Sequence, residues 1–179
     1  MPTVLVPLFE GFEEIEAVTI IDVLRRANIE VTTASLTTNT VMGAHAIAIT
    51  ADKLLDEVDF SQFDAIVLAG GAGTFRLRED PRIAKILIAQ ANANKLVAAI
   101  CAAPTVLSAA GLLKGKRATS FPSVKAQMEV GEYLTIPVVV DGKIVTSQGA
   151  GTAMLFALKL VEILQSEAIA TQLATDMIV

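Results

Sequence analysis

The segment Lys95-Leu96-Val97-Ala98-Ala99-Ile100-Cys101-Ala102-Ala103-Pro104-Thr105-Val106-Leu107 decides the interpretation of this 179-residue chain. Its first part, Leu96 to Ile100, is continuously apolar and predicts a short buried strand. Pro104 favours the first turn of a helix and Gly111 favours its end, so we expect a helix between them. The only cysteine, Cys101, therefore falls in a tight turn between strand and helix.

A cysteine in such a turn lies beside free backbone N–H groups and the positive end of a helix dipole. Both features lower the pKa of a thiol and favour the reactive thiolate. The alternative is an inert core residue, because free cysteine is among the most buried residue types. The turn by itself leaves both interpretations open.

Composition narrows the class of protein. The chain is 53% hydrophobic and 18% charged, with a net charge of −5. These values predict a single domain, residues 1–179, with a large core, and they exclude a disordered chain. The sequence has no basic run, no tryptophan and one tyrosine, which argues against nucleic-acid binding. A lone cysteine can form neither an internal disulfide nor a zinc site, and it suits a reducing compartment.

One uncharged run, Leu96 to Leu113, is as long as a membrane span. Pro104 and the high alanine content favour a buried core segment instead. The N-terminus enters the apolar stretch Thr3–Leu8 without the basic region of a signal peptide. We therefore expect a cytoplasmic protein that does not associate with membranes.

Apolar stretches typical of strands alternate along the chain with segments of helical periodicity. The expected strands are Thr3–Leu8, Ile29–Leu36, Asp64–Ala69 and Leu96–Ile100, with a hairpin at Thr135–Thr146. The segment Val41–Thr50, interrupted by Gly43, predicts either a hairpin or an extension of the sheet edge. The expected helices are Glu13–Ala27, Pro81–Asn94, Ala103–Gly111, Ala153–Leu164 and Ser166–Met177. Asp52 is expected to cap a short helix or turn that ends at Val58. The alternation predicts an α/β sandwich with a parallel sheet.

Ligands of such sheets bind at the carboxyl ends of the strands. Three loops have this position: Phe9–Glu16, Gly70–Thr74 and Cys101–Ala102. The glycines after Ala69 match neither the dinucleotide fingerprint nor the Walker loop. They indicate either a tight turn or a close approach of N–H groups to a reacting carbonyl. Residues 149–152 could place N–H groups similarly, but a helix start is the simpler interpretation.

Two kinds of side chain could assist the cysteine. His45 is the only histidine and lies in a hairpin far along the chain, so we do not expect it to be a catalytic base. Glu13 and Glu14 are expected to form a solvated first turn of helix. Glu16 lies among apolar residues, where burial raises the pKa of a carboxyl, and the protonated form can donate a hydrogen bond to a thiolate. The sequence shows no metal-ligand cluster and no cofactor motif.

Five motifs, in order, resemble the ThiJ/PfpI superfamily, and within it the branch of the parkinsonism-associated protein deglycase and its bacterial relatives. They span nearly the whole chain and are Gly11–Ala17, Asp22–Ala27, Ala69–Gly71, Ala98–Pro104 and Thr146–Thr152. The resemblance implies a flavodoxin-like three-layer sandwich with a mostly parallel sheet, and it implies that the chain forms homodimers.

The resemblance also implies roles for individual residues. Cys101 corresponds to an elbow cysteine that is easily oxidised to a sulfinate, and Glu16 corresponds to the helix glutamate that holds it. Gly70 and Gly71, together with the N–H of Ala102, correspond to the groups around the sulfur. The activities proposed for the family are glutathione-independent conversion of methylglyoxal to lactate, deglycation of thiols and amines, and redox-sensing or chaperone roles.

Two positions depart from the family pattern. Ala102 stands where protease-like members have histidine, so we do not expect peptidase activity. Phe121 stands where several deglycase-type members have a histidine, which removes an auxiliary imidazole. We expect Phe121, Gly149 and Ala150 to line a substrate pocket. His45 belongs to the hairpin that lies near the dimer interface in the family, and it is a further pocket candidate.

The expected function is therefore that of a cysteine-dependent glyoxalase or deglycase acting on small reactive carbonyls or glycated substrates. The Cys101 thiolate would attack an α-oxoaldehyde carbonyl, and Glu16 would donate or move the proton. The N–H groups of Gly71 and Ala102 would hold the oxyanion. The alternative is a redox sensor or chaperone-like stress protein without steady turnover.

Overall fold

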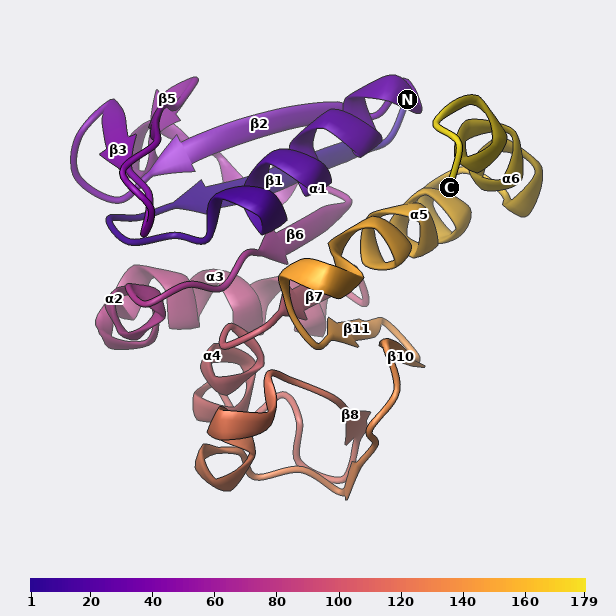
Figure 1. Cartoon of the computed structure of the whole chain (residues 1–179). Coiled ribbons are helices and arrows are strands. Elements are labelled where there is room, and N and C mark those ends of the chain that lie inside the picture. Colours follow the sequence, from indigo (N-terminus) through magenta and orange to yellow (C-terminus); the bar gives the residue numbers. More distant parts are fainter.

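The computed structural model describes residues 1–179 and shows a seven-stranded sheet between two layers of helices (Figure 1). The strand order is β10-β11-β7-β6-β1-β2-β5, and all neighbours are parallel except β10 and β11. In chain order these strands are β1 (Thr3–Leu8), β2 (Glu30–Ser35), β5 (Lys53–Leu54), β6 (Ala65–Leu68), β7 (Leu96–Ile100), β10 (Val138–Asp141) and β11 (Ile144–Ser147). The predicted three-layer sandwich with a mostly parallel sheet is confirmed.

The helices are divided between the two faces of the sheet. Helices α1 and α5 pack together on one face with α6 against α5, and α2, α3 and α4 lie on the other face (Figure 1). Their bounds are α1 (Glu14–Arg26), α2 (Thr74–Glu79), α3 (Pro81–Asn92), α4 (Pro104–Ala109), α5 (Ala153–Leu164) and α6 (Glu167–Asp176). None of these helices has the length and apolar character that crossing a membrane requires.

Shorter elements lie outside these three layers. Strands β3 (Thr40–Met42) and β4 (Ala48–Thr50) form an antiparallel hairpin, and β8 (Arg117–Ala118) pairs with β9 (Glu132–Tyr133) in parallel. Four 3₁₀ turns complete the chain: η1 (Leu55–Glu57), η2 (Phe60–Gln62), η3 (Pro122–Gln127) and η4 (Ala150–Thr152). The hairpin predicted around Gly142 is present, and of the two structures predicted around Gly43 the hairpin is the one that forms.

The central strands are apolar throughout because helices cover both faces of the sheet. Every residue of β6 and β7 is buried. The run from Leu96 to Leu113 is therefore a core strand followed by a helix, as the sequence predicted. The carboxyl ends of β1, β6 and β7 lie side by side, because these three strands are parallel neighbours.

One local expectation was wrong, and one helix was not predicted. Asp52 does not cap a helix; its Oδ2 accepts hydrogen bonds from the N–H (2.8 Å) and the hydroxyl (2.7 Å) of Thr33. Asp52, which directly precedes β5, is thereby hydrogen-bonded to strand β2. The glycine loop leads into α2, a helix that we had not expected, because its six residues have neither a side-chain cap nor a clear apolar period.

Candidate active site

Cys101 occupies the turn between β7 and α4 with a backbone φ of 64°. Residues other than glycine rarely adopt this left-handed conformation, and it is typical of a nucleophile at a strand-to-helix elbow. The N–H of Cys101 donates to the carbonyl of Ser147 (3.0 Å), and its carbonyl accepts from the N–H of Phe121 (2.8 Å). The turn is thus held from two sides, and the predicted position of the cysteine is confirmed.

The loops after β1 and β6 are joined by backbone hydrogen bonds beside this turn. The N–H of Glu13 donates to the carbonyl of Gly70 (2.8 Å), and the N–H of Gly73 donates to the carbonyl of Gly11 (2.9 Å). The N–H of Gly70 donates to Oε2 of Glu16 at 2.7 Å. The three loops that sequence analysis placed at the carboxyl edge therefore meet there.

Gly70 is at the point of closest packing. A Cβ at this position would lie 2.6 Å from the Cβ of Cys101, 2.9 Å from Oε2 of Glu16 and 3.0 Å from the N of Ala102. The absence of a side chain is what allows these three groups to approach one another. Gly71 has a φ of +120°, which favours glycine for conformational reasons.

Glu16 lies in the first turn of α1, and its exposed fraction is 0%. Its Oε2 bonds to the N–H of Gly70, while Oε1 is buried without a conventional hydrogen-bond partner. Burial raises the pKa of Glu16 to about 7, although the N–H of Gly70 and the thiol of Cys101 act in the opposite direction. The predicted elevation of this pKa is confirmed, and Glu16 can exchange a proton near neutral pH.

The expectation of a lowered thiol pKa was wrong. Burial raises the pKa of Cys101 to about 12, and the negative charge of Glu16 adds to this effect. The N–H groups of Ala102 and Gly71 hydrogen-bond to the sulfur and lower the pKa, but they do not outweigh desolvation. The negative charge of ionised Glu16 disfavours a neighbouring thiolate, so the thiol keeps its proton when Glu16 loses its own near neutral pH.

Phe121, Gly149 and Ala150 lie together, but Cys101 and Glu16 are not among the residues around their hollow. These three residues line a shallow hollow of about 360 Å³ together with Pro122, Gln148, Gly151 and Thr152. The half-exposed ring of Phe121 lies against Gly149. The N–H of Gly149 donates to Oγ1 of Thr152 (3.1 Å), so this segment is a helix start and not a free N–H cradle.

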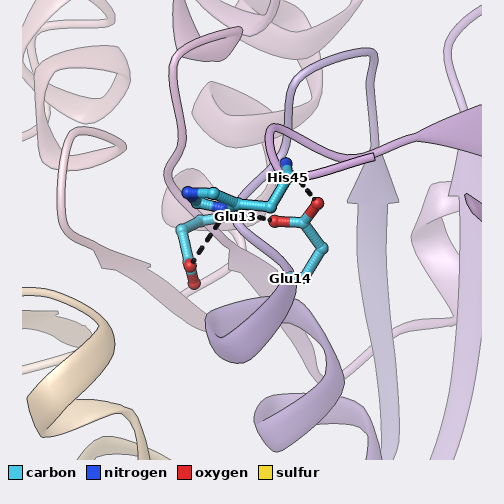
Figure 2. A group of neighbouring side chains, drawn as sticks. All are labelled: Glu13, Glu14 and His45. Carbon is cyan, nitrogen blue, oxygen red and sulfur yellow. Dashed lines mark hydrogen bonds and ion pairs between the residues drawn. The ribbon is translucent and has the colours of Figure 1, made fainter. Parts of the chain in front are cut away.

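His45, Glu13 and Glu14 form a separate cluster, which we call the His45 clasp (Figure 2). Nδ1 of His45 lies 2.8 Å from Oε2 of Glu14 and 3.9 Å from Oε1 of Glu13. The expectation of solvated acids was wrong, because the β3–β4 hairpin covers them. The side chain of Glu14 is 5% exposed and that of Glu13 is 14% exposed. The imidazole of His45 is therefore hydrogen-bonded to Glu14.

The clasp holds residue types that also bind metals, a cluster that sequence analysis did not find. Its donor atoms lie within 4.8 Å of one another. Linear spacing could not reveal it, because 31 residues separate Glu14 from His45. Hydrogen bonds account for the arrangement: Oε1 of Glu14 accepts from the backbone N–H of His45 (2.5 Å), and Oε2 of Glu13 accepts from the N–H of Glu16 (2.8 Å).

The chain is similar to known proteins in both sequence and structure. Residues 2–163 match the sequence model of the DJ-1/PfpI family. The glutathione-independent glyoxalase DJR-1.2 of Caenorhabditis elegans is 40% identical over 158 residues, which are 87% of this chain and 84% of that protein. The crystal structure of Drosophila melanogaster DJ-1beta superposes with a TM-score of 0.96 at 39% identity and covers 99% of this chain and 98% of that one.

A third relative is considerably longer. Protein DJ-1 homolog B of Arabidopsis thaliana is 42% identical over 164 residues, which are 90% of this chain and 37% of that protein. The chain thus spans only about two fifths of the length of the Arabidopsis relatives that it matches.

Proposed function

Because this chain belongs to the DJ-1/PfpI family, we propose that it is a cysteine-dependent glyoxalase or deglycase that acts on methylglyoxal or its adducts. The observation that carries the proposal is the meeting of Cys101, Glu16 and the N–H groups of Gly71 and Ala102 at one edge of the sheet. The name of the Caenorhabditis elegans relative supports the same chemistry.

In the first step the sulfur of Cys101 attacks the aldehyde carbon of methylglyoxal. The carboxylate of Glu16 accepts the thiol proton, and the carbonyl electron pair moves to oxygen. The N–H groups of Gly71 and Ala102 stabilise this oxyanion. Transfer of the proton from Glu16 to the oxygen completes a hemithioacetal. A thiol of raised pKa becomes nucleophilic here only because an adjacent carboxylate takes its proton.

In the second step Glu16 removes the hydrogen of the former aldehyde carbon as a proton and returns a proton to the neighbouring carbon, while the hydroxyl proton of the hemithioacetal passes to the ketone oxygen. The aldehyde carbon is thereby oxidised to a thioester and the ketone is reduced to an alcohol, so no external oxidant is needed. Water then hydrolyses the thioester, which releases lactate and restores the thiol. A carboxyl with a pKa of about 7 suits both directions of proton transfer.

The test is lactate formation from methylglyoxal without glutathione. We would compare the wild type with Cys101→Ser and Glu16→Gln, and use the exposed Glu30→Gln as the matched carboxylate control. Lactate from the wild type and Glu30→Gln, with strong loss in the other two, is the expected result. A wild-type protein that forms no lactate would refute the catalytic proposal.

A second function is supported by the exposure of the cysteine. Cys101 is only partly buried, and the N–H groups at its sulfur can also hold the oxygens of a sulfinate. An oxidation sensor or chaperone-like stress protein would use this chemistry without turnover. Peroxide titration followed by intact mass should then add two oxygen atoms to the wild type and none to Cys101→Ser. Addition to both would place the oxidation at methionine.

We also propose that the chain forms a homodimer. The support is an exposed apolar patch: Ile15 and Val18 on α1 are 58% and 47% exposed, and Ile47 beside β4 is 56% exposed. Apolar side chains grouped on a surface are typical of an interface. The single unpaired cysteine suits a reducing, cytoplasmic setting.

A further inference from the structure

We propose that His45 is a positioning residue for Cys101. It acts from the tip of the β3–β4 hairpin, through the first turn of α1, on the peptide group between Gly70 and Gly71. The inference rests on the proposed function in one respect, because it concerns the N–H that would stabilise the oxyanion.

The first link is between the hairpin and α1. The buried carboxylate of Glu14 accepts the backbone N–H of His45 (2.5 Å) at Oε1 and Nδ1–H of His45 (2.8 Å) at Oε2 (Figure 2). Its Oε1 also accepts the backbone N–H of Ile47 (3.4 Å). Removing the imidazole leaves Oε2 without this donor. An unsatisfied buried carboxylate is costly, so the hairpin and the helix would move relative to each other.

The second link is between the hairpin and the loop after β1. The N–H of Gly11 donates to the carbonyl of Met42 (2.8 Å), and the N–H of Ala44 donates to the carbonyl of Phe12 (2.8 Å). The loop is therefore fixed to the hairpin on one side. On its other side it is bonded to the glycine loop after β6.

The third link aims the donor at the sulfur. The carbonyl of Gly70 accepts the N–H of Glu13 (2.8 Å), and the N–H of Gly71 in the same peptide group hydrogen-bonds to the sulfur of Cys101. A peptide group is planar, so fixing its carbonyl also fixes the direction of its N–H. The side chain of Glu13 at the same time caps α1 through the N–H of Glu16 (2.8 Å).

The charges of Glu13 and Glu14 also favour the position of His45 in the clasp. Glu13 and Glu14 are the charged groups that face His45, and the hydrogen bond to Glu14 raises the pKa of the imidazole. The Nδ1–H of the neutral imidazole donates the same hydrogen bond. The positioning effect therefore depends on the donor and not on the positive charge.

Alkylation of Cys101 by iodoacetamide tests this inference without requiring turnover, because the chain has no other cysteine. The variants are His45→Ala, which removes the donor, and His45→Asn, which places an amide N–H near the position of Nδ1–H. Thr50→Ala is the matched control, since its hydroxyl meets only that of Thr40 on the same hairpin. The activity kcat/KM for methylglyoxal is measured on the same proteins.

We expect His45→Ala to slow alkylation and lower kcat/KM by about tenfold each, because small displacements at a reacting group have effects of this size or larger. His45→Asn should remain within about twofold of the wild type, and Thr50→Ala should match it. Equal alkylation rates in His45→Ala and the wild type would overturn the inference. So would a His45→Asn protein as slow as His45→Ala, because the charge would then be responsible. A wild type that forms no lactate refutes the proposed function, and the alkylation rates still decide the role of His45.

Discussion

The carboxylate of Glu16 accepts a 2.7 Å hydrogen bond from the backbone N–H of Gly70, although 54 residues separate them in the sequence. This bond joins the first turn of α1 to the carboxyl end of β6. It holds a buried acid beside the elbow that carries Cys101, and it leaves Oε1 without a conventional partner.

Replacing Glu16 by glutamine should stabilise the protein at alkaline pH. The pKa of Glu16 is raised from 4.5 to about 7, so the native state keeps a proton that the unfolded chain has lost. Stability of the wild type therefore falls as the pH rises through this window, by roughly 3 kcal/mol. Denaturant titration at about pH 5 and about pH 8 should show the advantage of Glu16→Gln growing by this amount. An advantage that does not change with pH would contradict desolvation of Glu16.

The same group should control the pH dependence of the reaction. If ionised Glu16 takes the thiol proton, kcat/KM for methylglyoxal rises with pH through about 7. Glu16→Gln should lose this rise together with about 100-fold or more of the activity. The measurement is a pH–rate profile of both proteins. An identical rise in the variant would assign the titration to another group.

Gly70→Ala should disrupt the site. The new methyl group would lie 2.6 Å from the Cβ of Cys101, so the chain has to shift, at a cost of about 1–3 kcal/mol. Activity should fall by about 100-fold because the reacting groups are displaced. Gly151→Ala is the matched control for stability, since nothing lies within 4 Å of its Cβ position. Thermal unfolding of both variants and a lactate assay of Gly70→Ala are the measurements, and equal thermal stability of the two variants would contradict the packing argument.

Phe121→His should increase activity. Its backbone N–H already bonds to the carbonyl of Cys101 (2.8 Å), so the substituted residue is held next to the Cys101 turn. The ring is 46% exposed, and the change should therefore have little effect on stability. We expect kcat/KM to rise by about tenfold, below the usual range for general acid–base help because the position is partly solvated. Phe121→Leu, which adds no imidazole, should leave kcat/KM unchanged. An equal increase of kcat/KM in both variants would mean that the shape of the pocket, and not the imidazole, is responsible.

Ile15→Glu should dissociate the proposed homodimer. A charge in the middle of an apolar interface is desolvated without a partner, which is unfavourable. Light scattering after size-exclusion chromatography should give about twice 18.8 kDa for the wild type and the single mass for the variant. Leu155→Glu, at a 50% exposed position of α5, is the control and should remain dimeric. A monomeric wild type would refute the dimer.

The sequence by itself determined the layered α/β fold and the position of the cysteine. Those conclusions depended on signals between neighbouring residues: the apolar run before Cys101, Pro104 after it, and helical spacing around Glu16. The same local signals predicted the burial of Glu16. Secondary structure and the direction of side chains follow from residues a few positions apart, so they can be inferred without coordinates.

Only the tertiary structure decided the environment of the charged groups. The β3–β4 hairpin buries Glu14, the hydroxyl and N–H of Thr33 hold Asp52, and burial beside Glu16 raises the thiol pKa that the turn alone was expected to lower. In each case the deciding partner comes from a distant part of the chain or from solvent exclusion. Desolvation and through-space charge depend on which segments pack together, and linear spacing does not contain that information.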